Sequence, residues 1–397
     1  MTSSIAGPAA LTPTDAYGTG RYSPLLPGTA LVHADLHNHS TLSDGTGDPA
    51  EAFGSMRRSG LDVGALTDHA NLATPIGHLL HGGVASWLGG IDAKAWRQTA
   101  RLADSANDEG RFVALRGFEW SHPLLGHVSV WGTEAYTHPL RSLGLDIRPL
   151  YDWLVDDDGA AGGLAGFNHP GGRGAARFAG FRYHGGLGRR LVSLEMFNKT
   201  DDYLFAGTDS GADSPLTECL ARGWHPALTG ASDEHGANWG VPAGKGRAGL
   251  FVSELTRTGV REALLARRTF AARVKGLRLA ATLAGVPMGG TVRHRSGSLP
   301  LLLDVELPPD QRGTPLSVQV LRPAASVPHI AVTVDLQAPG PGEPPVGFPV
   351  HLDAADGGWA VVRLSDPAAP ADHRAPPDYA PLGRSIAYSS PFWLDPT

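Results

Sequence analysis

The sequence is poor in several residue types, and each scarcity excludes a class of protein or site. Cys219 is the only cysteine among 397 residues, so the chain offers neither an internal disulfide nor a cysteine cluster for zinc. The only lysines are Lys94, Lys199, Lys245 and Lys275, and the net charge is −6, so nonspecific nucleic-acid binding is not expected. No apolar run approaches the ~18 residues of a membrane span. No secretory signal is recognisable after Met1, and we expect a cytoplasmic protein with no membrane contact.

The length and composition are those of a globular protein with more than one domain. Hydrophobic residues make up 42% of the chain and charged residues 18%. Residues 1–30 are rich in Pro, Gly, Ser and Thr and predict an irregular leader. The remaining length is enough for one large domain and a smaller one.

Residues 31–275 alternate between predicted strands and helices. Asp48 and Pro49 before residues 50–58, with Gly60 behind them, predict a helix with an N-cap, a first-turn proline and a C-terminal stop. Continuous apolar runs favour parallel strands that are buried on both faces. We expect an α/β barrel with its chemistry at the carboxyl ends of the strands, and a doubly wound open sheet is the alternative. The predicted strands are 30–39, 61–67, 112–118, 127–131, 163–167, 191–197, 226–229, 249–253 and 269–274.

The character of the sequence changes near residue 276. Segments 277–283, 299–307, 316–321, 330–336 and 359–364 alternate in polarity, and turn-forming residues such as 339–345 separate them. No helical periodicity is visible there. We interpret residues 276–397 as an antiparallel β-domain without clustered metal ligands, and we expect it to contribute no catalytic group.

Histidines and carboxylates gather at the ends of the predicted strands. His37 and His39 are two apart and share one face of a strand, and Asp233 and His235, again two apart, follow a later strand. A carboxylate such as Glu119 can bridge two metal ions, because each of its oxygens binds separately. A single histidine at a strand end is more often a structural residue, but a series of them would be costly to bury without metal. The remaining candidate ligands are Asp44, His69, His127 and His169.

The order of these motifs resembles that of the polymerase and histidinol phosphatase (PHP) superfamily over residues 30–270. The resemblance lies in residues 35–45, Thr67-Asp68-His69, Gly117-Phe118-Glu119, Gly126-His127, Asn168-His169-Pro170 and residues 232–235. Within the superfamily, residues 195–198 and 259–270 and the β-rich tail are most similar to the branch that includes carbaryl hydrolases.

The resemblance implies a distorted (β/α)7 barrel with two to three divalent ions of Zn, Mn or Fe. It assigns one ion to His37, His39, Glu119 and Asp233, and a second to Glu119, His127 and His169. It assigns a third to Asp44, His69 and His235, although some members of the superfamily have histidine at the position of Asp44. A hydroxide that bridges the metals, held by Glu119 and Asp233, would be the nucleophile.

These features predict a metal-dependent hydrolase that acts on a small, anionic molecule. A phosphoesterase is favoured, because three divalent ions outweigh the charge of three carboxylates and one hydroxide. Arg173 and Lys199 follow predicted strands and are candidates for binding an anionic substrate group, although each is equally consistent with a solvated surface charge. A carbamate or ester hydrolase is the alternative enzyme, and a non-catalytic PHP module that binds a partner is the alternative of another class.

Overall fold

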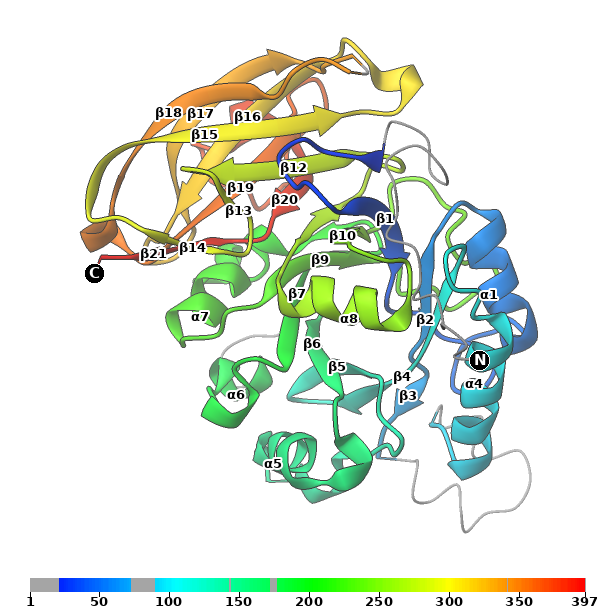
Figure 1. The fold of residues 1–397 in the computed structure, drawn as a ribbon. Coiled ribbons are helices and arrows are strands. Elements are labelled where there is room, and N and C mark those ends of the chain that lie inside the picture. Colours follow the sequence, from blue (N-terminus) through cyan, green and yellow to red (C-terminus); the bar gives the residue numbers. More distant parts are fainter. Residues whose placement is uncertain (1–20, 73–89, 143, 172–176, 341, 397) are drawn as a thin grey trace, which may run out of the picture.

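The structure is a computed structural model, and it describes residues 21–72, 90–142, 144–171, 177–340 and 342–396. It is a mixed α/β fold with one large sheet and a second, four-stranded antiparallel sheet. The helices lie on the outside of the first two-thirds of the chain, and the C-terminal strands pack above it (Figure 1). Within the described residues, no helix has both the length and the apolar character needed to cross a membrane.

From β1 to β9, the strands of the large sheet follow one another in space in the order of the chain. The ladders among these strands therefore join segments that are close in the sequence. Parallel ladders join β1 to β2, β2 to β4, β6 to β7 and β7 to β9. This order lacks the reversal on which a doubly wound sheet is built. The strands are β1 (Ala30–Asp35), β2 (Val63–Leu66), β3 (His69–Ala70), β4 (Val113–His122), β5 (Gly126–Trp131), β6 (Leu164–Asn168), β7 (Leu191–Asn198), β8 (Asp201–Asp202), β9 (Ala227–Ala231), β10 (Arg247–Val252) and β11 (Thr269–Ala272).

The prediction of a purely parallel barrel strand set was wrong at β5 and β10. β5 is antiparallel to both β4 and β6, and β10 is antiparallel to β1. The cause at β5 is local, because only residues 123–125 connect it to β4, and a parallel crossover needs a dozen residues or more. Pro123 in this short connection is the turn signal that could have revealed the hairpin.

A closed barrel is not confirmed. β9 and β10 lie side by side, and a Cβ on Gly230 of β9 would come within 2.7 Å of the Arg247 carbonyl oxygen of β10. Over the described ranges, however, no hydrogen-bonded ladder joins these two strands. The sheet therefore curls around a buried centre without closing by hydrogen bonds.

The helices connect successive strands and bury one face each. In α1 (Pro49–Arg58), the Asp48 carboxylate accepts a hydrogen bond from the Ala50 amide at 2.9 Å, which confirms the predicted N-cap. The helix gives way at Gly60, whose φ of 87° lies in the left-handed region that glycine adopts freely. The others are α4 (Ala93–Ala106), α5 (Arg148–Asp156), α6 (Phe178–Phe181), α7 (Pro215–Ala221) and α8 (Arg257–Leu265).

The C-terminal region is mainly antiparallel β-structure, as predicted, and no α-helix occurs in its described residues. The exception is β14, which pairs with β21 in parallel. Its separate sheet has the order β13–β12–β15–β18, and its remaining strands extend the large sheet through the ladder between β11 and β20. The boundaries at residues 30 and 275 stay predictions. The strands are β12 (Arg278–Leu283), β13 (Val286–Pro287), β14 (Thr291–Arg293), β15 (Ser296–Glu306), β16 (Pro315–Arg322), β17 (His329–Gln337), β18 (Val346–Asp353), β19 (Trp359–Asp366), β20 (Arg384–Ser389) and β21 (Phe392–Asp395).

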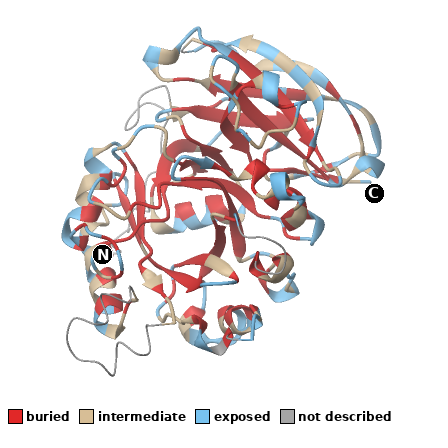
Figure 2. Cartoon of the chain, turned by 180° about the vertical axis from the view of Figure 1, so that it is seen from behind, coloured by how far each residue is buried: buried red, intermediate tan, exposed pale blue. Residues whose placement is uncertain are grey.

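The two regions share a hydrophobic core. Leu31, Phe251 and Phe270 from the first region pack in one cluster with Leu279 and Val318 from the second. Figure 2 shows buried residues running through the strands of both regions, while the outer faces of the helices are exposed. The C-terminal strands therefore complete the core of the region that carries the candidate ligands.

We expect Phe270→Ala to lower the free energy of unfolding by about 3–5 kcal/mol, because its ring is fully buried at this junction. The control is Leu302→Ala on β15, where the side chain is 36% exposed and the loss should stay below about 1 kcal/mol. Urea unfolding of both variants measures the difference. Equal losses would show that the junction is not part of the core.

Candidate metal centre

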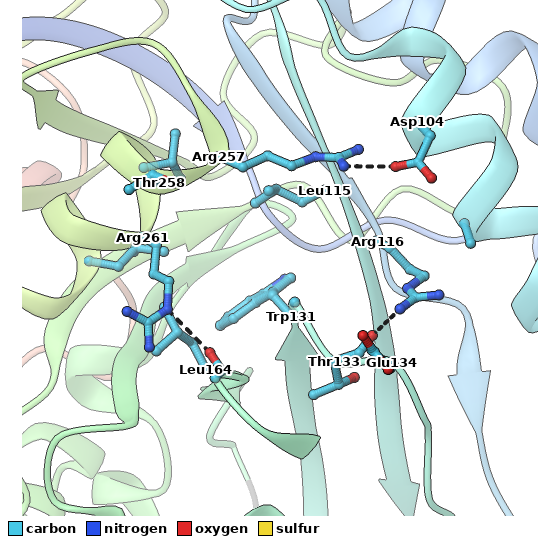
Figure 3. A pocket seen from close by; sticks show the side chains of 15 residues that line it. Asp104, Leu115, Arg116, Trp131, Thr133, Glu134, Leu164, Arg257, Thr258 and Arg261 are labelled. Carbon is cyan, nitrogen blue, oxygen red and sulfur yellow. Dashed lines mark hydrogen bonds and ion pairs between the residues drawn. The ribbon is translucent and has the colours of Figure 1, made fainter. Parts of the chain in front are cut away.

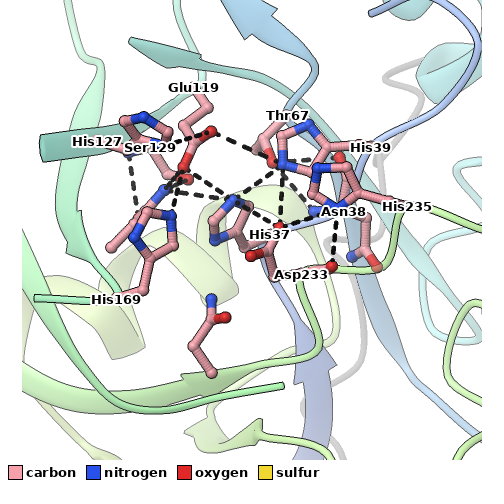
Figure 4. Close-up of polar contacts among 12 residues, drawn as sticks. His37, Asn38, His39, Thr67, Glu119, His127, Ser129, His169, Asp233 and His235 are labelled. Carbon is pink, nitrogen blue, oxygen red and sulfur yellow. Dashed lines mark hydrogen bonds and ion pairs between the residues drawn. The ribbon is translucent and has the colours of Figure 1, made fainter. Parts of the chain in front are cut away.

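The nine predicted ligands come together in the structure, although they are spread over about 200 residues of sequence. We call these nine residues the ligand cluster. They are His37 and His39 after β1, Asp44 in the following loop, His69 in β3, Glu119 in β4, His127 in β5, His169 after β6, and Asp233 and His235 after β9. Figure 4 shows His37, His39, Glu119, His127, His169, Asp233 and His235 pointing toward one another.

Glu119 and His127 do not lie where a barrel would place them. Glu119 lies inside β4, which continues to His122, and does not end the strand as predicted. His127 is the second residue of the antiparallel strand β5 and pairs with Ser121 of β4. Both ligands therefore come from one hairpin, and the hairpin brings them to the same edge as the strand ends that carry the other ligands.

Glu119 is the centre of the cluster, and its side chain has no solvent exposure. One of its oxygens, Oε1, lies 3.0 Å from His37 Nε2 and 3.2 Å from His169 Nε2. The other, Oε2, lies 2.6 Å from His69 Nδ1 and 3.2 Å from His127 Nδ1. The two oxygens thus face different pairs of imidazoles, which is the arrangement that a bridging carboxylate needs.

Asp44 marks the outer end of the cluster. Its carboxylate lies 3.4 Å from His69 Nε2, 3.5 Å from His235 Nε2 and 3.9 Å from His39 Nδ1. Its side chain is 42% exposed, whereas Glu119 is buried. This group sits at the rim, and it contains the three residues that the sequence assigned to a third ion.

The structure groups the inner ligands differently from the sequence-based assignment. His169 shares Glu119 Oε1 with His37, and His127 shares Oε2 with His69. Within each such group, the ligand atoms lie within 4.8 Å of one another. Asp233 joins His37 and His39 in a further group, with its Oδ1 at 3.3 Å from His39 Nε2.

Among the described residues, three buried polar atoms of the cluster make no hydrogen bond of good geometry: His39 Nδ1, His127 Nδ1 and Asp233 Oδ1. Two of them still have charged neighbours, since His127 Nδ1 lies 3.2 Å from Glu119 Oε2 and Asp233 Oδ1 lies 3.3 Å from His39 Nε2. Buried polar atoms are rarely left without a partner, because each one costs the full penalty of its desolvation. Imidazole nitrogens and carboxylate oxygens are the donor atoms that Zn²⁺, Mn²⁺ and Fe²⁺ accept in proteins. These atoms therefore fit a set of bound divalent ions.

The electrostatics of the cluster favour cations. Burial opposes the charged form of Glu119, but His127, His37 and His69 outweigh this effect and hold its pKa well below the usual range. Burial likewise opposes a charge on His69, yet Glu119 and Asp44 raise its pKa to about 10. By contrast, burial and the neighbouring His69 lower the pKa of His39 to about 3. The carboxylates thus attract positive charge, while His39 is kept in the neutral form that coordinates metal.

The buried carboxylate of Glu195 on β7 is a functional candidate that sequence reasoning left out of the site. It accepts hydrogen bonds from His37 Nδ1 at 2.9 Å and from the His169 amide at 2.7 Å. Asn198 donates to the same carboxylate at 2.9 Å, which fixes its orientation. A carboxylate behind a metal-binding imidazole sets its tautomer and direction. The sequence drew attention to residues 195–198 only as a point of resemblance, and nothing in that segment shows that Glu195 contacts a histidine after β1.

Two further carboxylates, Asp68 and Asp35, hold the loops that carry the candidate ligands. Asp68 accepts from the Ser40 amide at 2.8 Å and from Ser43 Oγ at 2.7 Å, and burial raises its pKa to about 6. Asp35 accepts from the Ser232 amide at 3.1 Å.

Three residues at the site have left-handed backbone conformations that are unusual for residues other than glycine. The φ angles are 28° for His169, 47° for Asp233 and 49° for Lys199. Such conformations cost free energy and persist where surrounding contacts enforce them. In His169, which follows β6 directly, and in Asp233, two residues after β9, this conformation directs a candidate ligand toward the cluster.

Of the two predicted substrate-binding cations, the structure describes one. Lys199 lies beside the cluster, and its ammonium group is 3.2 Å from Asp233 Oδ2 with the side chain half exposed. Arg173 lies outside the described residues. Lys199 therefore touches a candidate metal ligand.

We expect Glu195→Gln to weaken metal binding about 10- to 100-fold while the fold stays intact, because the orienting charge behind His37 is lost. Competition with a chromophoric chelator measures the affinity, and thermal melting checks the fold. The control is Glu262→Gln on the exposed face of α8, which should leave the affinity unchanged. Equal affinities of the two variants would remove Glu195 from the centre.

No family model and no curated protein matches the chain. Among solved structures, a two-domain protein from Bacteroides vulgatus that contains a predicted PHP-like metal-dependent phosphoesterase matches at 15% identity over 94% of this chain and 98% of that one, with a TM-score of 0.46. A candidate metal-dependent phosphoesterase from Bifidobacterium adolescentis matches at 15% identity, covering 52% of this chain and 88% of that one, with a TM-score of 0.29. A candidate histidinol phosphatase from Listeria monocytogenes matches at 13% identity, covering 51% and 96%, with a TM-score of 0.26. At these values the similarities establish neither the family nor the reaction.

Proposed function

We propose that the chain is a metal-dependent hydrolase whose ligand cluster holds two or three divalent ions. The observation that carries the proposal is the convergence of six histidines and three carboxylates into overlapping groups, each with its ligand atoms within 4.8 Å of one another. Nitrogens on His39 and His127 that make no hydrogen bond of good geometry lie within the same groups. A purely structural role does not require imidazoles and carboxylates to gather with donor atoms left unused.

Different residues of the cluster would hold different ions. Glu119 would contribute to two sites, since its oxygens face different histidine pairs, and Asp233 would close the site of His37 and His39. Bound divalent ions would lower the pKa of a coordinated water to ~7 and polarise the bond to be broken. The chain itself positions these ligands rigidly, because Glu195 and Asn168 hold His37 and Glu119 by hydrogen bonds of 2.9 and 2.7 Å.

A phosphoester is our first choice of substrate. Three divalent ions exceed the combined charge of Asp44, Glu119 and Asp233, and an anionic substrate would complement the remaining positive charge. The ammonium group of Lys199, whose side chain is half exposed, adds a further positive charge at the edge of the cluster. A phosphate group brings charges that need such partners in a partly desolvated site.

Two observations favour the second candidate, a carbamate or ester hydrolase. Glu195 adds a fourth carboxylate, itself buried, next to the three of the ligand cluster, so the positive charge of the centre is smaller than the sequence suggested. Lys199 already forms an ion pair with Asp233 and is only partly available to a substrate anion. A neutral carbamate needs neither cation.

We expect the purified protein to contain bound Zn, Mn or Fe and to lose hydrolysis of a generic aryl phosphodiester after chelation. His37→Ala and Glu119→Ala should lose metal and activity together, because each removes a ligand from the buried groups. Metal analysis by mass spectrometry and a chromogenic assay measure the two quantities. Full turnover by metal-free protein would disprove the mechanism, and a metal-loaded protein inactive on esters and carbamates would favour a binding module.

We expect Lys199→Ala to separate the two substrate classes. If the substrate is a phosphoester, kcat/KM should fall about 10- to 100-fold, from ~1.5–3 kcal/mol for a charge-assisted hydrogen bond, while hydrolysis of a neutral aryl carbamate barely changes. The matched control is Lys94→Ala on the exposed face of α4. Metal content must be measured for both, since Lys199 contacts Asp233.

Equal losses on charged and neutral substrates would refute a role for Lys199 in binding an anion. Efficient carbamate cleavage without phosphoesterase activity in the unaltered protein would make the second candidate the better one.

A further inference from the structure

The segment that carries His37 and His39 is held at both ends by tryptophan side chains. Before it, the indole N–H of Trp131 donates to the Leu36 carbonyl at 2.8 Å. Trp131 belongs to β5 and also lines a cavity away from the ligand cluster (Figure 3). At the other end, the indole N–H of Trp239 donates to the His39 carbonyl at 3.0 Å. Both indoles are buried, so each hydrogen bond is shielded from water.

Trp239, unlike Trp131, lies outside the sheet. It stands in the loop after β9, four residues after His235. Its main-chain carbonyl accepts hydrogen bonds from the hydroxyl groups of Ser55 and Ser59, both at 3.2 Å, where α1 ends. Trp239 therefore anchors the loop of His235 to a helix.

Trp239 also contacts the loop that carries Asp44. A Cβ on Gly47, three residues after Asp44, would lie 2.7 Å from Cζ2 of Trp239, so the main chain of this glycine lies directly against the indole ring. The Thr46 amide donates to the His235 carbonyl at 2.7 Å. The loop of Asp44 is thus fixed on the loop of His235, with the Trp239 ring packed between this contact and α1.

Three of the four members of the outermost ligand group are tied to Trp239. We call this group, His39, Asp44, His69 and His235, the rim group, and its ligand atoms lie within 4.8 Å of one another. The Asp44 side chain is 42% exposed, so its position depends on the loop that carries it more than on its own packing. Trp239 holds this loop on both sides of Asp44, through the His39 carbonyl and through the glycine that follows. A metal site needs such support, because a small displacement of one ligand weakens the binding of the ion.

We propose that Trp239 is a positioning residue for the rim group and determines how tightly the outermost ion is bound. This role rests on the proposed function, since it requires that the ligand cluster hold metal. The two groups that contain Glu119 include none of the residues that Trp239 contacts. The ions at Glu119 therefore do not depend on the indole.

The test is Trp239→Phe, which keeps an aromatic ring beside Gly47 and removes the N–H that binds the His39 carbonyl. Asp44→Ala identifies the ion concerned, because among the groups of described residues Asp44 belongs to the rim group alone. We expect the affinity of Trp239→Phe for this ion to fall about tenfold or more, while the affinities for the other ions stay within about twofold. Equilibrium dialysis of the metal-free chain against Mn²⁺, with the bound metal counted by mass spectrometry, measures these affinities.

The matched control is Trp224→Phe. Trp224 is as fully buried as Trp239, and its indole N–H donates to the Phe181 carbonyl at 2.9 Å, outside the ligand cluster. Urea unfolding should show a similar loss of stability in the two variants, whereas only Trp239→Phe should lose Mn²⁺ affinity. Equal losses of affinity in both would show a general effect of stability and would overturn the proposal.

A double variant tests whether Trp239 acts through the rim group. In the Asp44→Ala background, Trp239→Phe should leave the affinities for the remaining ions unchanged, because the rim group is already incomplete. If Trp239→Phe does not fold, Gly47→Ala takes its place, since its methyl group would meet the ring of Trp239 and displace the same loop. It should produce the same selective loss.

The outcomes separate this role from the proposed function. An unaltered chain that binds no Mn²⁺ would refute both. A chain that binds Mn²⁺ but loses no ion in Asp44→Ala, or keeps its affinity for the outermost ion in Trp239→Phe, would refute only the positioning role.

Discussion

The negative charge of a carboxylate without solvent contact has to be compensated by neighbouring groups, and Glu119 is such a carboxylate. Imidazole nitrogens of four histidines lie within 3.2 Å of its oxygens. Burying an ionised carboxylate without such partners would cost several kcal/mol or more. The loops after β1 and β6 and the strands β3 and β5, which carry these four histidines, must therefore meet around Glu119. The left-handed backbone of His169 is a local cost of bringing its imidazole there.

A structural feature could be predicted from the sequence when the contacts that determine it lie close together in the chain. The N-cap of α1 is set by Asp48 and Pro49 within one turn, and it was predicted residue by residue. The nine candidate ligands were predicted from histidines and carboxylates near strand ends and from the order of their motifs, and the structure brings them together. The hairpin that carries Glu119 and the contact of Glu195 with His37 depend on partners far away in sequence, so apolar strand patterns alone did not reveal them.

The C-terminal region also shows that local patterns predict strands better than long-range packing. Its alternating sequence predicted antiparallel β-structure, but it did not predict that these strands extend the sheet of the first region. The ladder between β11 and β20 makes one continuous sheet of two parts with different sequence character. Arg273 stands directly after β11, where the sequence shows only an isolated arginine. Its contact with the Phe197 ring, at 4.3 Å from the ring centre, becomes visible only in the folded structure.

The bridge between Asn38 and Glu234 has a consequence for how the molecule is made. It joins the loop after β1 to the loop after β9. His37 and His39 are therefore synthesised nearly two hundred residues before Asp233 and His235. During that interval the groups that contain His37 and His39 lack Asp233 and His235. If the cluster holds divalent ions as proposed, the complete set of ligands forms only after β9 has been made.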